Sequence, residues 1–268
     1  MSSTVLATPD FPAMADMRDH VQPVPRRLRG VVAGITVFDT VSANYAWDTP
    51  KYPHYLVPRD DVLPGVLIDE DREQRLRRGA VHLHGLRIGE TEIPSVARVY
   101  DAAAGSVAGL VRFDWQALEW FEEDEQVFVH PRNPYTRVDA LRSGRHVRVE
   151  LGGHLLAEST SPVLVFETGL PTRYYLDRNC LDLSLLRRTD TRTACPYKGE
   201  TSDYWTADLP GRVEEDVAWS YRQPFPALTP IAGLVAFYND RVEITVDGTT
   251  LPQVVDLSLL SADARTGR

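Results

Sequence analysis

The densest group of reactive side chains in this 268-residue chain lies in one short segment, Cys195-Pro-Tyr-Lys-Gly199. Proline fixes φ and glycine frees the backbone, so the segment is predicted to form a tight turn and not part of a helix. A thiol close to an ammonium group is deprotonated more readily, and the thiolate is the nucleophilic form. Cys195 and Lys198 are therefore candidate catalytic residues. The alternatives are a cysteine packed as a small apolar residue and a lysine extended into solvent.

Further candidates flank this turn. Glu167 and Tyr174 precede it and could transfer protons, with Glu167 as a general acid or base. Residues that could line a ligand site are Tyr197, Arg178, Tyr204, Trp205, Trp219 and Tyr221. Clustered aromatic rings can form a cage for a flat or cationic ligand, although most aromatic side chains serve as core. Neighbouring residues of a strand point to opposite faces, so at most one of Tyr204 and Trp205 can face a cavity.

Several blocks of the sequence occur twice in the same order. Residues 45–62 align with 164–181, and Ala108–Phe113 aligns with Ala232–Phe237. The glycine-punctuated segment 30–39 likewise has the character of 145–158. Blocks that repeat in order predict a duplicated unit of about a hundred residues, which is an ordinary size for one domain.

The alignment of the two copies places Asp48 opposite Glu167 and Arg59 opposite Arg178. An acid and a base that recur at one spacing predict an ion pair in each copy that fixes two strands. The alternative is that Glu167 faces a pocket and Arg178 orients it.

Strand patterns dominate both copies. In the second copy they predict strands over residues 147–150, 155–158, 163–167, 173–176, 232–238 and 242–246. Helical spacing is confined to 114–121 and 181–188. The predicted organisation is a flexible arm (1–26), a first divergent copy (27–129), a connector (130–144), a second copy with the cysteine turn (145–250) and a tail (251–268).

Five segments of the second copy carry a resemblance to a known family: 166–175, 193–199, 218–221, 231–238 and 246–248. With them, the chain resembles two-copy members of the family called domain of unknown function 427. The resemblance implies a mainly β fold: two tandem β-tent-like domains of antiparallel sheets with few short helices. Some relatives of that fold hold small cyclic ligands in an aromatic cage. The nucleotidyltransferase label sometimes attached to the family has no support here, because the sequence lacks a phosphate-cradling glycine loop and paired metal-binding aspartates.

The first copy departs from this pattern, because it has no counterpart of the cysteine turn. Its nearest segment is Val81-His-Leu-His-Gly85. His82 and His84 would lie on one face of a strand at a spacing that suits a metal ion, but the sequence offers no obvious third ligand. No metal and no other cofactor is therefore predicted, and two sites, one in each copy, could not share one chemistry.

The amino-acid composition argues against several classes of binding partner. There are 29 basic and 38 acidic residues, and the net charge of −9 opposes binding to nucleic acid and to anionic membrane surfaces. The apolar stretches are too short to cross a bilayer. Two cysteines do not make a disulfide framework, so we expect a cytoplasmic protein.

The sequence thus favours a cofactor-independent enzyme acting on a small carbonyl-bearing or cyclic metabolite in a pocket of the second copy, with the first copy as scaffold or lid. The alternatives are a non-catalytic ligand-binding module with an aromatic cage and a scaffold protein without a pocket. The substrate, the reaction class and the oligomeric state stay open.

Overall fold

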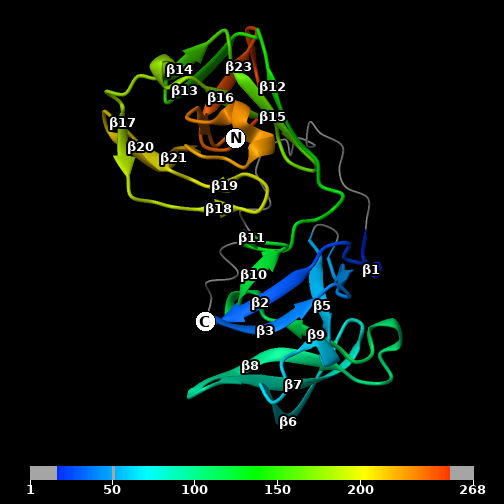
Figure 1. Cartoon of the computed structure of the whole chain (residues 1–268). Coiled ribbons are helices and arrows are strands. Elements are labelled where there is room, and N and C mark those ends of the chain that lie inside the picture. Colours follow the sequence, from blue (N-terminus) through cyan, green and yellow to red (C-terminus); the bar gives the residue numbers. More distant parts are fainter. Residues whose placement is uncertain (1–16, 50–51, 254–268) are drawn as a thin grey trace. The chain divides into compact units, whose positions relative to one another are not determined.

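The computed structural model describes residues 17–49 and 52–253. They form two compact units, one ending at Pro134 and the other beginning at Tyr135. Each unit contains one seven-stranded and one four-stranded antiparallel sheet (Figure 1). The predicted mainly β fold and the predicted duplication are both confirmed.

The first unit has its strands in the following order. The seven-stranded sheet runs β1 (Val21–Pro23), β4 (Asn44–Ala46), β5 (His54–Pro58), β9 (Leu110–Phe113), β8 (Thr91–Tyr100), β7 (Gly79–Ile88) and β6 (Leu67–Leu76). The four-stranded sheet runs β11 (Glu125–Val127), β10 (Glu119–Glu122), β2 (Leu28–Val32) and β3 (Ile35–Thr40).

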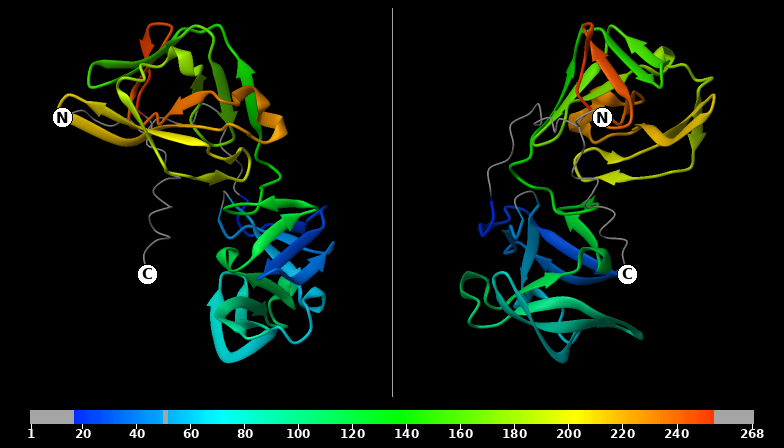
Figure 2. Two further views of the ribbon diagram at one scale, coloured as in Figure 1. Left: turned by 60° about the vertical axis from the view of Figure 1, so that its left-hand side comes forward. Right: turned by 180° about the vertical axis from the view of Figure 1, so that it is seen from behind.

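The second unit repeats this order strand for strand (Figure 2, green to red). Its seven-stranded sheet runs β12 (Val138–Arg142), β15 (Val163–Glu167), β16 (Arg173–Leu176), β22 (Val235–Phe237), β21 (Arg212–Ser220), β20 (Asp203–Leu209) and β17 (Leu186–Thr189). Its four-stranded sheet, taken in the direction used for the first unit, runs β24 (Thr249–Thr250), β23 (Glu243–Val246), β13 (Val147–Leu151) and β14 (His154–Ser159). A two-stranded hairpin, β18 (Ala194–Cys195) and β19 (Gly199–Glu200), has no counterpart among the described strands of the first unit.

The two copies also share their register. Leu28 lies opposite Thr40 and Val147 opposite Ser159, so corresponding residues are 119 positions apart (147 minus 28). Both hairpins contain a bulge at the same place, after Gly30 in β2 and after Val149 in β13. Such bulges bend a strand at a fixed point, so a bulge shared by both copies indicates a common backbone plan.

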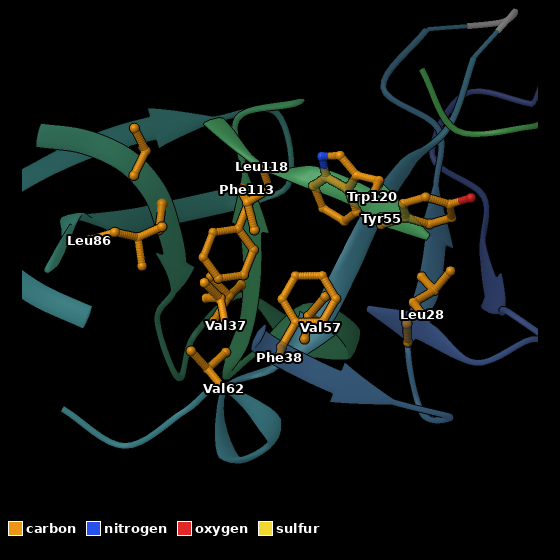
Figure 3. Packing of buried hydrophobic residues seen from close by; sticks show 14 of the residues in the cluster. Leu28, Val37, Phe38, Tyr55, Val57, Val62, Leu86, Phe113, Leu118 and Trp120 are labelled. Atoms are coloured by element: carbon orange, nitrogen blue, oxygen red, sulfur yellow. The ribbon is translucent and has the colours of Figure 1, made fainter. Parts of the chain in front are cut away.

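Both sheets of a unit contribute to its main core, because alternate residues of each strand point inward. In the first unit, Phe38, Phe113 and Trp120 pack together with Tyr55 and Val57 in this core (Figure 3). Leu56 lies between the last two in sequence and belongs to a separate cluster. Each seven-stranded sheet therefore has an inner face on the main core and an outer face with its own cluster.

Two predicted boundaries differ from the observed strands. The arm predicted over 1–26 lies largely outside the described residues, but its last part forms β1, and Val24 is buried in the core. The connector predicted over 130–144 contributes β12 to the second sheet. Residues 251–253 are the only described part of the predicted tail.

The two predicted helices are wrong. Residues 114–121 contain only the 3-10 turn Trp115–Ala117 before β10 begins, and 181–188 ends in β17. The helical segments of the described chain are 3-10 turns, the longest being Pro226–Ile231. None of its helices is long and apolar enough to span a membrane.

Candidate functional site

The segment Cys195-Pro-Tyr-Lys-Gly199 forms the turn of the β18–β19 hairpin, as predicted. The Lys198 amide donates to the Cys195 carbonyl at 3.3 Å, which closes the turn. Gly199 has a φ of +98°, in the region that side-chain-bearing residues rarely adopt. The Phe225 amide donates to the Lys198 carbonyl at 3.0 Å, so the turn is also attached to a distant part of the copy.

This turn directs Lys198 toward Glu167, the last residue of β15. The Lys198 ammonium donates to a Glu167 carboxylate oxygen, and both residues are buried, with exposed fractions of 7% and 8%. The same Nζ atom lies 3.9 Å from the Cys195 sulfur. The structure therefore brings three predicted residues together in the order thiol, ammonium, carboxylate.

The predicted ion pair between Glu167 and Arg178 is wrong, since Glu167 pairs with Lys198. Arg178 is exposed, and its guanidinium carbon lies 5.5 Å from the centre of the Trp205 ring. The equivalent prediction for the first copy is also wrong, because Asp48 pairs there with Arg78 and Arg112.

Burial and neighbouring groups shift the pKa values of Lys198 and Cys195. Burial lowers the pKa of Lys198, but the neighbouring Cys195, Glu167 and Tyr175 raise it more, so the pKa lies above its ordinary value. Lys198 is thus a cation at neutral pH and cannot act there as a neutral base or amine nucleophile.

The thiol behaves differently from the expectation. Burial raises the pKa of Cys195 above its ordinary value, although the Lys198 ammonium and the amides of Tyr197 and Lys198 act in the opposite direction. The resting state is consequently a neutral thiol beside a charged ion pair, and the thiolate needs a proton acceptor or a raised pH.

Tyr174 does not lie with this group. It packs in the core between the two sheets of the second copy, whereas its neighbour Tyr175 belongs to the outer cluster. Burial raises the pKa of Tyr175 to about 12, although the Lys198 charge lowers it in part. The indole nitrogen of Trp219 donates to the Tyr175 hydroxyl at 3.3 Å. Sequence reasoning missed Tyr175, because the repeat with Tyr55 drew attention to Tyr174.

The predicted ligand-binding aromatic residues fall on two faces of the sheet. Tyr204, Trp219 and Tyr221 belong to the outer cluster with Tyr175, and all are buried. Trp205 belongs to the inner core, which agrees with the predicted alternation of Tyr204 and Trp205. Tyr197 is half-buried within the turn itself.

Two further residues, Tyr238 and Arg173, contact the outer cluster. The Tyr238 hydroxyl lies 3.2 Å from that of Tyr204. The guanidinium carbon of Arg173 lies 5.6 Å from the centre of the Trp219 ring and 5.7 Å from that of Tyr238. Arg173 also donates to Asn239 at 2.7 Å. A cation of the chain thus already occupies the position that a cationic ligand would take on these two rings.

The histidines of the first copy do not correspond to the cysteine turn. His82 lies opposite Val99, and His84 lies opposite Ala97. These positions match Asp203 and Trp205 of β20 in the second copy. His84 is buried, and its Nδ1 lies 3.1 Å from the His82 carbonyl oxygen. No group of three or more potential metal ligands occurs among the residues that the structure describes.

Comparison with known proteins identifies the family to which the chain belongs. No curated protein matches the chain significantly. A family model described as domain of unknown function (DUF427) matches twice, over residues 20–124 and 139–248, and each match covers one pair of sheets. The chain therefore belongs to the DUF427 family and contains two copies of its domain.

Proposed function

We propose that the second copy is a cofactor-independent enzyme that acts on a small carbonyl-bearing or cyclic metabolite, with Cys195 as its nucleophile. The observation that carries this proposal is the series Cys195, Lys198 and Glu167, in which the thiol is partly buried and the ion pair is buried. Tyr175 and Tyr221 of the outer aromatic cluster lie close enough to interact with Cys195. Reactive groups of this kind are expensive to bury, and their concentration in one place is typical of functional sites.

Each group has a distinct role in the proposed reaction. The Cys195 sulfur bonds to the carbonyl carbon, the bond from that carbon to its leaving group breaks, and the departing atom takes the thiol proton. The Lys198 ammonium stabilises the thiolate and the negative charge that develops on the carbonyl oxygen. Glu167 holds Lys198 in position and in its charged form.

The outer aromatic cluster supports a second candidate, a non-catalytic module that binds a small ligand through Tyr204, Trp219 and Tyr221. Arg173 weakens this alternative for cationic ligands, because it already lies over the Trp219 ring. It leaves flat neutral ligands open.

The wider setting of the proposal comes from composition. We place the protein in the cytoplasm because both cysteines are free thiols, and we expect a small-molecule partner and not nucleic acid because the net charge is −9. We also assign the paired sheets of each copy to the β-tent class.

A minimal ester, p-nitrophenyl acetate, tests the proposed nucleophile. We expect one acetyl group on Cys195 by peptide mass mapping, with release of one equivalent of p-nitrophenol. Replacing Cys195 by Ala should abolish the adduct, and Lys198→Met should slow its formation at least tenfold. Because the pKa of Cys195 is raised, the wild-type rate should still increase beyond pH 9.

Cys180→Ala is the matched control, since it removes the other thiol and should leave the rate unchanged. Lys198→Arg keeps the charge and covers the case in which Lys198→Met does not fold. An acetyl group on other residues, or equal rates in wild type and folded Lys198→Met, would contradict the mechanism. A thermal-shift screen with cyclic amides, nucleosides and aromatic metabolites then identifies ligands. Mass analysis of each ligand before and after incubation separates catalysis from binding alone.

A further inference from the structure

The outer sheet face of the first copy carries arginines where the second copy carries the aromatic cluster. Arg98 of β8 lies directly opposite Arg112 of β9. In the second copy the corresponding pair is Trp219 opposite Ala236. Like charges directly opposite one another on neighbouring strands are destabilising, so this pair needs negative charge around it.

The chain supplies part of that negative charge. Arg112 donates to Asp48 at 2.9 Å, and Arg98 pairs with Asp114. A third arginine, Arg78, donates to the other oxygen of Asp48 at 3.0 Å. Three guanidinium groups against two carboxylates leave one excess positive charge in a chain whose net charge is −9.

Arg78 differs from the other two arginines. Its terminal nitrogens donate to the backbone carbonyls of Asp19, His20 and Trp47 at 2.7 to 3.2 Å. Arg78 therefore has a structural role, because it holds two backbone segments together. Arg98 and Arg112 each use one nitrogen for their carboxylate partner, and Arg112 also has a side-chain hydrogen bond with Tyr100. A guanidinium has five N–H donors, so further donors remain on each. Their side chains are 21% and 24% exposed, so solvent reaches both.

The pKa of His54 in β5 indicates the sign of the electrostatic potential near these arginines. Its Nε2 lies 3.7 Å from an Asp48 oxygen, which by itself would favour the protonated ring. The pKa of His54 is nevertheless lowered to about 4, first by burial and then by the positive charge of Arg112, with Arg78 and Arg98 acting in the same direction. Positive charge therefore outweighs the carboxylate at this position.

We propose that Arg98 and Arg112 of the first copy, next to His54, bind an oxyanion, that is, a phosphate or carboxylate group of a small ligand. Guanidinium forks match the geometry of both groups and bind them through paired hydrogen bonds. This site is separate from the Cys195 site and does not depend on the function proposed for it.

Nuclear magnetic resonance of the full chain with inorganic phosphate tests the site. We expect saturable shifts of the Arg98 and Arg112 Nε–H signals and a rise in the pKa of His54, because the bound anion offsets the arginine field. Arg112→Ala should weaken phosphate binding at least tenfold, since it removes the central fork and reproduces the residue of the second copy. Acetate in a parallel titration shows whether carboxylates bind as well or phosphate alone.

Arg87→Ala is the matched control. Like Arg112→Ala, it removes one arginine from the same sheet. Arg87, however, lies in β7, is half-exposed and pairs with Glu92. We expect its phosphate affinity to equal that of the wild type, and Arg112→Lys to keep the charge but bind less tightly than the wild type. The proposal is overturned if neither anion gives saturable shifts in the wild type. It is equally overturned if Arg87→Ala and a folded Arg112→Ala lose the same affinity.

Discussion

The outer faces of the two seven-stranded sheets share one backbone plan but carry different chemistry. At equivalent positions of neighbouring strands the second copy has Trp219 and Ala236, and the first copy has Arg98 and Arg112. Tyr221 and Tyr100 also correspond, and both are buried. The register is thus preserved, while the aromatic side chain Trp219 of the second copy is replaced in the first by Arg98, which faces a second arginine.

One element of the site is common to both copies. An acid lies at the end of the second strand of the sheet order, Asp48 just after β4 in the first copy and Glu167 as the last residue of β15 in the second. A base from the connection between the last two strands of the sheet order reaches it. That base is Arg78 from the turn between β6 and β7, and Lys198 from the β18–β19 hairpin. A conserved pairing can therefore be made by connections that differ completely in conformation.

The largest expected difference between the copies comes from the outer aromatic cluster. Trp219→Ala removes a buried indole and should lower the free energy of unfolding by about 3–5 kcal/mol. Arg98→Ala, at the equivalent position, removes a partly exposed ion pair and should cost no more than about 1 kcal/mol. Urea unfolding followed by circular dichroism measures both. Similar losses would mean that the two faces are energetically alike.

The buried ion pair gives the next effect. Lys198→Met leaves the Glu167 carboxylate buried without its cation and should destabilise the chain by about 3 kcal/mol. Adding Glu167→Leu should recover much of that loss, because the double variant has no unpaired buried charge. A double variant less stable than Lys198→Met would show that the carboxylate has other stabilising partners.

The smallest effect is an acid sensitivity that His54 gives to the first copy. His54 is neutral in the folded chain, with a pKa of about 4, and returns to about 6.5 on unfolding. The unfolded chain therefore binds the proton first as the pH falls. The contribution of the neutral His54 ring to the free energy of unfolding is therefore complete above pH 6.5 and is lost as the pH falls toward 4. For a side chain that is one-third exposed, we expect this loss to be about 1 kcal/mol.

Comparison of wild type with His54→Gln isolates this contribution. In phosphate-free buffer the stability difference between the two proteins should shift in favour of His54→Gln as the pH falls from 7 to 4.5. A difference that does not change with pH would contradict the neutral histidine. The second copy has Arg173 at the equivalent position, and arginine does not titrate in this range.

Strand positions could be predicted from sequence because they depend on local alternation and on turn residues. The predicted strand over 163–167 coincides with β15, and that over 173–176 with β16. The helix predicted over 114–121 failed because tertiary packing overrides local spacing: the Trp115 and Trp120 rings stack at 4.9 Å and both pack on the core.

The candidate site was only partly predictable, for a related reason. The turn and the choice of Cys195, Lys198 and Glu167 follow from residue types. Their pairing does not, because Lys198 lies 31 positions after Glu167 and reaches it only when the connection folds back over the sheet. The repeated Arg59 and Arg178 suggested a nearer partner. Spacing along the chain cannot show which base a folded connection brings to an acid.

The connection between the last two strands of the sheet has a wider consequence. In the first copy it is a short turn between two ten-residue strands, and in the second the strands are shorter and a separate hairpin lies between them. The second copy thus has shorter strands at this edge and a longer connection between them, and the order of the strands in both sheets is the same as in the first copy. This edge is consequently the part of the domain where new reactivity can arise by insertion alone, without any change in the core that keeps the fold intact.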